Sequence, residues 1–216
     1  MNTPPIRSTP ENADGTATLP LYRGTSHGQT VFYVGEDLFG TVFRVARDGS
    51  QTTVLQPGPY WQKRCDRIAV AGDGSPIAYT CRATDITGEN PDLGEEIYGS
   101  DAYGSSVVHL TDSPFAGDSL DPDIAAATGR VAFVRTAPRF AQTTPQRVHT
   151  VELDGSEAVV ASLPNDLLHE PTISADGSRI VVIDSDSEAV IGGPLLLADS
   201  NGSQLTSLTP GPWSYP

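Results

Sequence analysis

The chain has 216 residues, of which 38% are hydrophobic, and it contains 21 glycines and 18 prolines. This composition suits a turn-rich folded domain and excludes a disordered chain, which would lack enough apolar residues to form a core. The formal net charge of -14 argues against a nucleic-acid partner, and no apolar run is long enough for a membrane-spanning helix, so we expect neither nucleic-acid binding nor membrane insertion.

The chain begins with a segment rich in proline and threonine that has no apolar core. We expect residues 1–18 to form a flexible leader, because such a segment can bury little surface. It lacks the features of an intact signal peptide. Its composition fits either the mature start of an exported protein or the start of a cytosolic one.

Paired strands begin at Leu21. The stretch LYRGTSHGQTVFYVG predicts a hairpin that turns at Gly28, and VFRVARDGSQTTVLQ predicts a second hairpin that turns at Asp48-Gly49. Further along, CDRIAVAGDGSPIAYTC predicts a hairpin with its turn at Asp73-Gly74, followed by another near Gly104. An Asp-Gly pair between alternating apolar residues indicates a tight turn, because glycine readily adopts a positive φ.

Two further pairs of hairpins follow. The stretch LDPDIAAATGRVAFVR (Leu120 to Arg135) aligns with HEPTISADGSRIVVID (His169 to Asp184), which turns at Asp176-Gly177. Each is followed by a second hairpin, with turns at Asp154-Gly155 and Asn201-Gly202. The chain therefore contains the same two-hairpin unit four times, at intervals of about 50 residues.

Four-stranded antiparallel units at this interval predict an all-β fold, a β-propeller with about four blades, whereas a β-sandwich would not require equal units. We expect residues 19–216 to form the propeller domain, with blades at about 19–56, 57–112, 113–163 and 164–209 and a closing segment at 210–216. We favour closure of the ring within one chain. The alternatives are half of a dimeric eight-bladed ring and a fragment of a larger propeller, since an unclosed blade exposes a strand edge.

The fourth unit, EPTISADGSRIVVIDSD followed by LLLADSNGSQLTSLT, resembles the WD40-like Pro-Asp (PD40) repeat of TolB-like propellers. The resemblance covers about residues 19–213 and is close in the fourth unit, fair in the second and third, and weak in the first. No unit keeps the proline that precedes the first aspartate of that repeat. The resemblance implies a propeller that serves as a protein-docking surface in the bacterial envelope.

The longer segments between strands are expected on one face of the propeller, opposite the short Asp-Gly turns. Binding residues are often carried on loops that a rigid scaffold positions, so this loop-rich face and the adjoining channel mouth are the expected ligand-binding surface. Its candidate residues are Trp61, Arg64, Phe115, Asp118, Arg139, Phe140, His169, Glu170 and Trp213. The two tryptophans have an alternative role as wedges between adjacent blades.

An acidic loop on the same face carries a set of candidate metal ligands. Carboxylates gathered on a loop can coordinate calcium, which prefers oxygen ligands. The spacing does not match an EF-hand, and the alternative is a solvated acidic loop. We therefore expect that no cofactor is required, with calcium as the alternative. The candidate ligands are Asp85, Glu89, Asp92, Glu95 and Glu96.

The sequence predicts no catalytic residues. The stretch GTSHG (Gly24 to Gly28) matches G-x-S-x-G, but a strand follows it, whereas the nucleophilic serine of that motif precedes a helix. The four histidines show no metal-binding spacing, and no glycine-rich phosphate loop precedes a helix. The chain is more consistent with a non-catalytic protein than with an enzyme.

The two cysteines of the chain, Cys65 and Cys81, lie eight residues on either side of Asp73, the centre of a predicted turn. A symmetric register places them opposite each other, close enough for a disulfide. A disulfide indicates a periplasmic or secreted protein, because it persists in oxidising compartments. The alternative is a pair of reduced, buried thiols in a cytoplasmic protein.

Three functions remain. We expect a non-catalytic TolB-like scaffold that binds a protein partner through its loop-rich face. One alternative is a calcium-assisted hydrolase or lyase acting on a sugar or lactone, because fold alone does not exclude catalysis. Its carboxylates would come from Asp85, Glu89, Asp118, Asp121 or Glu170. The other alternative is a self-assembling propeller, a homodimer in which a second chain completes the ring.

Overall fold

The computed structural model describes residues 21–27, 30–35, 41–46, 48–55, 64–72, 74–82, 94–112, 117–136, 146–162, 167–185 and 194–209. These residues form β-strands and the turns between them, and none of them lies in a helix. Within this part of the chain, accordingly, no helix could cross a membrane. The predicted all-β fold is confirmed.

The strands form four antiparallel sheets of four strands each, which we call blades 1 to 4. In every blade the strands lie side by side in chain order. Blade 1 contains β1 (Leu21–His27), β2 (Thr30–Gly35), β3 (Val42–Ala46) and β4 (Thr52–Val54). Blade 2 contains β5 (Arg64–Val70), β6 (Ile77–Arg82), β7 (Glu96–Ser100) and β8 (Val108–His109). Blade 3 contains β9 (Ser119–Ile124), β10 (Val131–Arg135), β11 (Arg147–Val151) and β12 (Glu157–Ser162). Blade 4 contains β13 (Leu167–Ile173), β14 (Arg179–Ser185), β15 (Leu195–Asp199) and β16 (Thr206–Ser207).

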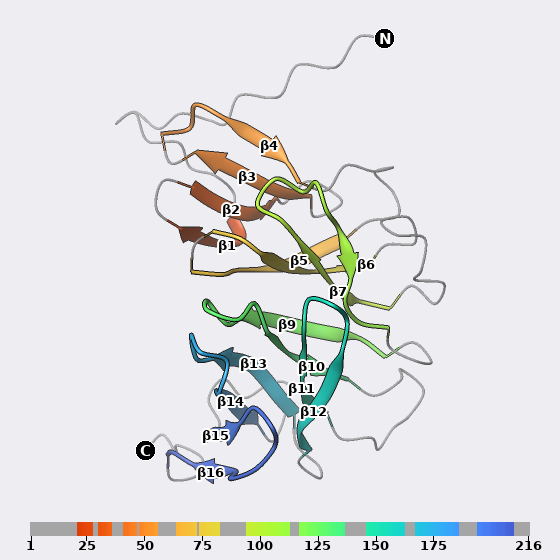
Figure 1. Cartoon of the computed structure of the whole chain (residues 1–216), viewed down its shortest axis with the longest axis vertical. Coiled ribbons are helices and arrows are strands. Elements are labelled where there is room, and N and C mark those ends of the chain that lie inside the picture. Colours follow the sequence, from red (N-terminus) through yellow and green to blue (C-terminus); the bar gives the residue numbers. More distant parts are fainter. Residues whose placement is uncertain are drawn as a thin grey trace, which may run out of the picture.

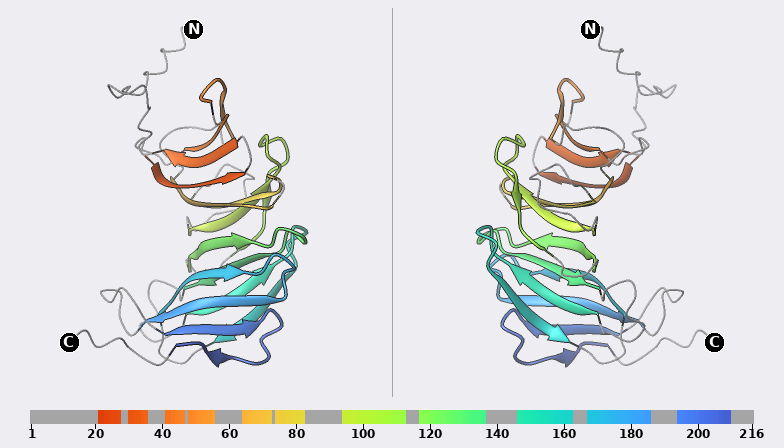
Figure 2. Two further views of the ribbon diagram at one scale, coloured as in Figure 1. Left: turned by 90° about the vertical axis from the view of Figure 1, so that its left-hand side faces the viewer. Right: turned by 90° about the vertical axis from the view of Figure 1, so that its right-hand side faces the viewer.

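Successive blades pack against one another through their first strands, β1, β5, β9 and β13. Blades 1 and 4 lie at opposite ends of the resulting stack (Figure 1), and the views from the sides show the same order (Figure 2). Among the described residues, blades 1 and 4 lack the strand-to-strand packing that joins successive blades. The propeller is therefore partial, and the expectation of closure within one chain is wrong for the described strands. The expected leader, 1–18, and closing segment, 210–216, lie outside the described residues.

Asp-Gly-Ser and Asn-Gly-Ser turns join many of the strands. In the turns that begin at Asp48, Asp154, Asp176 and Asn201, the side-chain oxygen accepts a bond of 2.9–3.0 Å from the serine N–H two residues later. The glycines between them have φ of 74–83°, which glycine adopts without steric cost. Hydrogen bonds from neighbouring serine hydroxyls and N–H groups lower the pKa of Asp48, Asp154 and Asp176. These turns form where the sequence predicts them.

Three apolar cores lie between successive blades. We call the face that a blade turns toward the next blade its trailing face, and the opposite face its leading face. Each core joins a trailing face to a leading face, and every side chain in it is at most 7% exposed. The core between blades 1 and 2 contains Phe32, Val42, Leu55, Cys65, Ile77, Tyr79, Cys81 and Tyr98. The core between blades 2 and 3 contains Ala69, Ala71, Ala78, Ile97, Leu110, Ile124, Val131, Phe133 and Val151. The core between blades 3 and 4 contains Ala125, Ala132, Val134, Val148, Leu168, Ile173, Ile180, Val182, Leu196 and Ala198.

The turn between β7 and β8 of blade 2 lies directly against the end of blade 1. Gly104 in this turn has φ of 70°, and a Cβ atom there would lie 2.4 Å from the backbone oxygen of Leu55. Beside it, the Tyr103 ring lies 4.9 Å from the guanidinium carbon of Arg44, which is a cation–π distance. Only glycine fits this approach between the two blades.

A disulfide joins the first two strands of blade 2. Cys65 on β5 pairs directly with Cys81 on β6, and their Cα atoms are 4.0 Å apart. Both side chains are buried, at 3% and 0% exposed. The predicted cross-strand disulfide is confirmed, and it lies one residue before a bulge that shapes the candidate site.

Candidate binding pocket between the inner strands

The first strands of blades 2, 3 and 4 each contain a β-bulge at the same place. In blade 3, Leu120 pairs with Val134 and Asp123 with Ala132, so two residues of β9 oppose one residue of β10. The register of β5 and β13 shifts in the same way. A bulge bends its strand and redirects its side chains. The bulged pairs are Asp66-Arg67, Asp121-Pro122 and Glu170-Pro171.

Backbone strain marks the bulges of blades 3 and 4. Asp121 has φ of 54° and Glu170 has φ of 49°, in the left-handed region that residues other than glycine rarely adopt. Such a conformation costs roughly 1 to 3 kcal/mol and is common at functional sites. Each strained residue precedes a proline, which has no N–H to lose from the strand ladder. The strain therefore directs attention to these bulges as a binding site.

The three bulges line a pocket of about 410 Å³. Every residue of its lining comes from the first strand of a blade, so the pocket spans blades 2, 3 and 4 along the inner edge of the propeller. Half of the lining residues carry a charge. They are Arg67 and Ile68 on β5, Asp121, Pro122 and Asp123 on β9, and Glu170, Pro171 and Thr172 on β13.

Arg67 joins all three blades through its guanidinium group. Its Nε lies 2.5 Å from Oδ1 of Asp121, and its Nη1 lies 3.4 Å from Oε1 of Glu170. The Asp121 side chain is 12% exposed, whereas that of Glu170 is 53% exposed. Coulomb attraction strengthens as water is excluded, so the pair with Asp121 is the stronger one and the pair with Glu170 is weakened by solvent.

Asp123 fixes the position of blade 4 relative to blade 3. Its Oδ2 accepts a hydrogen bond of 2.8 Å from the backbone N–H of Ile173 on β13. Burial raises the pKa of Asp123, and the hydrogen bonds from the N–H groups of Ile173 and Ile124 oppose that rise. Asp123 therefore serves the packing of the blades as well as the charge of the pocket.

The pocket has an excess of negative charge, because three carboxylates face a single guanidinium. Glu170 contributes the most accessible of these carboxylates. A guanidinium or ammonium group that enters the pocket would therefore be attracted by charge that Arg67 does not fully balance. The charge of the pocket therefore suits a basic side chain.

Of the predicted binding surface, one residue is among the lining residues of this pocket, and a second is its neighbour in the chain. Glu170 lines it, and His169 precedes Glu170 on β13, where it pairs with Ile183. Asp118 lies elsewhere: its Oδ1 accepts a 2.9 Å bond from the N–H of Glu95, which ties blade 3 to blade 2. Arg64 lies in β5, and its side chain is outside the described part of the chain. The remaining predicted residues, Trp61, Phe115, Arg139, Phe140 and Trp213, also lie outside the described residues.

The acidic loop is described only at its end. Glu96 on β7 is 1% exposed, and one of its carboxylate oxygens accepts a 2.5 Å bond from the hydroxyl of Thr111. Glu95 accepts a 3.0 Å bond from Arg82. No group of three or more metal-binding side chains occurs among the described residues. Because Asp85, Glu89 and Asp92 lie outside them, the calcium prediction stays untested.

Ser26, the serine of the G-x-S-x-G stretch, lies within strand β1. It pairs with Val31 of β2 in a regular antiparallel register. This is the strand context that the sequence predicts, and it differs from the strand-to-helix turn that presents a nucleophilic serine in hydrolases.

Sequence reasoning missed the roles of Arg67 and Asp123. A signal was present, because the aligned repeats place Asp66, Asp121 and Glu170 at equivalent positions before their turns. The alignment does not show which side chains meet across blades. That depends on the bend of each bulge and on the angle between neighbouring sheets.

Of the comparisons with known proteins, only the one with solved structures finds matches. No family model matches the chain, and no curated protein does. The chain is 18% identical to the putative TolB from Agrobacterium tumefaciens, with a TM-score of 0.60 over 84% of this chain and 61% of that one. It is 14% identical to a structure of a nidogen/laminin complex, with a TM-score of 0.58 over 83% of this chain and 60% of that one. It is 15% identical to a puromycin-hydrolyzing peptidase from Mycobacterium tuberculosis, with a TM-score of 0.62 over 88% of this chain and 30% of that one.

These likenesses concern the fold, since the identities are low. The chain spans less than two thirds of the length of each of the three structures. Four consecutive four-stranded antiparallel sheets, arranged as in the TolB structure, show that the chain has a TolB-like β-propeller fold.

Proposed function

We propose that this chain is a non-catalytic protein-binding module that receives a basic side chain of its partner in the pocket between β5, β9 and β13. The observation that carries the proposal is the excess of carboxylates over guanidinium groups in that pocket. Strained bulges hold two of these carboxylates, Asp121 and Glu170. A preorganised site loses little conformational freedom on binding, which favours affinity.

The disulfide and the structural neighbours support a docking role outside the cytoplasm. The bond between Cys65 and Cys81 fits an oxidising compartment, which supports a location in the periplasm or outside the cell. One structure with this likeness is of a complex between nidogen and laminin. The net charge of -14 favours encounter with a basic surface, because long-range attraction raises association rates.

Binding of a labelled hexa-arginine peptide, followed by fluorescence anisotropy at low salt, tests this function. We expect Glu170→Gln to weaken binding about threefold to tenfold, because it removes one accessible charge from the pocket. The matched control is Asp154→Asn, which also removes one charge. Asparagine keeps the acceptor that the β11–β12 turn requires.

Two outcomes would contradict the pocket as the binding site. If both variants weaken binding equally, the peptide responds to overall charge and not to this pocket. If Glu170→Gln binds as well as the unchanged chain, the partner's basic group lies elsewhere.

A further inference from the structure

One leucine recurs at the end of three blades. Leu55, Leu110 and Leu208 each donate a backbone hydrogen bond of 2.7–3.0 Å to the third strand of their own blade. Leu55 is 1% exposed and Leu110 is 4% exposed, whereas Leu208 is 50% exposed. The first two are buried because the next blade covers them. Leu208 occupies the same position in the last described blade.

The rest of the trailing face of blade 4 is also apolar. Val181 pairs with Leu197, and Ile183 pairs with Leu195, so these four side chains lie on one face of β14 and β15. All four are partly exposed. At the equivalent positions of β10 in blade 3, Ala132 and Val134 are 0% and 1% exposed because blade 4 covers them. This face therefore continues, without a described neighbour, the series of interfaces that holds the blades together.

The partner that such a face fits is the leading face of a blade. Blade 1 has a leading face that no other blade covers among the described residues, since blade 2 packs on its trailing face. On that leading face Phe43 pairs with Val54, and Val54 is 45% exposed. The two end faces of the chain thus have the same chemistry as the faces that meet inside it.

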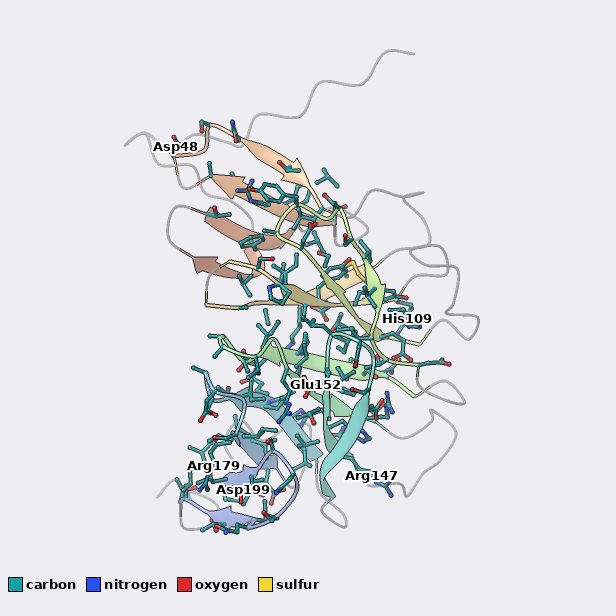
Figure 3. The ribbon with its side chains drawn as sticks, in the orientation of Figure 1. Asp48, His109, Arg147, Glu152, Arg179 and Asp199 are labelled. Atoms are coloured by element: carbon teal, nitrogen blue, oxygen red, sulfur yellow. A yellow bond between two sulfur atoms is a disulfide. The ribbon has the colours of Figure 1, made fainter. Side chains whose placement is uncertain are left out.

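Charge selects blade 1 over a second blade 4. Residues 164–209 carry seven carboxylates and one arginine, whereas residues 19–56 carry three of each sign. That one arginine, Arg179, pairs with Asp199 of its own blade at 3.0 Å (Figure 3). Two copies of blade 4 would repel each other, whereas blade 1 carries no net charge.

We propose that the trailing face of blade 4 binds the leading face of blade 1 in a second copy of this chain. Two copies related by a two-fold axis form this contact twice, so the two partial propellers close into one ring. The contact continues the internal interfaces, which bury apolar side chains of the same kind. The proposal is independent of the peptide-binding pocket.

The solution mass of the full chain over a concentration series tests this proposal. We expect a dimer with twice the chain mass of 22.8 kDa. Leu208→Glu and Val54→Glu should each raise the dissociation constant at least about tenfold, because each places a charge in both apolar contacts. Both positions are exposed in the single chain, so the fold should be kept, and circular dichroism checks this.

The matched control is Leu205→Glu. Leu205 is 43% exposed and lies just before β16, outside the paired residues of β15 and β16. Leu205→Glu should leave the dissociation constant of the dimer unchanged. A chain that stays at 22.8 kDa at every concentration would overturn the proposal, and so would equal dissociation by Leu205→Glu. Loss of the dimer in Leu208→Glu but not in Val54→Glu would show contact between two blade 4 faces and would overturn it as well.

Discussion

Blade 2 and blade 4 have the same strand order and the same alternation of apolar residues, yet their surroundings differ. Blade 2 lies between two other blades, and its Tyr79, Tyr98 and Leu110 are all buried. Blade 4 has a described neighbour on its leading face only, and Leu208 on the other face is half exposed. The alternation therefore determines which residues can be buried, and the neighbouring blade determines which of them are.

The largest expected effect compares the equivalent leucines of these two blades. Leu110→Ala should lower the free energy of unfolding by about 2 to 5 kcal/mol, because it leaves a cavity in a closed core. Leu208→Ala should lower it by less than about 1 kcal/mol at concentrations where the chain is monomeric. Urea denaturation measures both. Similar losses in the two variants would show that blade 4 is covered on both faces within one chain.

Removal of the disulfide tests how much this bond stabilises blade 2, which lies between two other blades. Replacing Cys65 and Cys81 together by alanine should lower the free energy of unfolding by about 3 kcal/mol, because the bond closes a loop with a sequence separation of 16. A reducing agent should destabilise the unchanged chain to a similar degree and leave the variant unaffected. Two reactive thiols in the denatured, unreduced chain would contradict the bond itself.

Two glycine substitutions separate the energetic cost of the contact between blades 1 and 2 from the cost of strain within a turn. Gly104 and Gly155 both have positive φ, but a Cβ at Gly104 would meet Leu55 of blade 1, whereas a Cβ at Gly155 has no atom within 4 Å. Gly155→Ala should lower the free energy of unfolding by about 1 kcal/mol, because alanine is strained at a positive φ. Gly104→Ala should lower the free energy of unfolding by more than about 2 kcal/mol, because the backbone at Leu55 must also shift. Equal thermal destabilisation would mean that the blades do not meet at this turn.

The smallest expected effect concerns Asp123, which links blades 3 and 4. Burial raises its pKa in the folded chain above the ordinary value of 3.8, so the folded state holds this proton more tightly than the unfolded state does. Its contribution to stability is therefore present at low pH and falls as the pH rises through the folded-state pKa. Asp123→Asn keeps the acceptor for the N–H of Ile173 and should remove this fall in stability with pH. Asp123→Ala lacks the acceptor and should lower the free energy of unfolding by about 1 kcal/mol at every pH.

Urea denaturation between pH 4 and pH 7 distinguishes these cases. The stability gain of Asp123→Asn over the unchanged chain should grow as the pH rises above 3.8. A gain that shrinks over this range would mean that the folded chain prefers the ionised form of Asp123.

Local patterns were sufficient to predict the hairpins and the disulfide. The Asp-Gly-Ser turns form because the aspartate side chain and the glycine backbone satisfy the turn by themselves. Cys65 and Cys81 face each other because both lie on strands that the same turn joins. The bulge at Asp66-Arg67 lies between Cys65 and this turn, and its one-residue shift places Cys65 opposite Cys81 instead of Arg82. The symmetric register assumed in the sequence analysis predicts the right pair without including this shift.

The pocket and the open end could not be predicted in the same way. The contact between Arg67 and Asp121 joins two blades, and it depends on bulges that local alternation does not reveal. Closure within one chain was expected because each blade resembles the next. The described blades instead form an open stack with blades 1 and 4 at its two ends (Figure 1). Ring closure depends on the angles between blades, and equal repeats do not determine those angles.

Hydrogen exchange of the full chain at two concentrations tests most directly whether a neighbouring copy covers the trailing face of blade 4. At high concentration the amides of β14 and β15, together with those of β3 and β4, should exchange more slowly than at low concentration, while β6 and β7 stay unchanged. Exchange in β14 and β15 that is as slow as in β6 and β7 at both concentrations would contradict the open stack, because it would mean that the trailing face of blade 4 is covered within one chain.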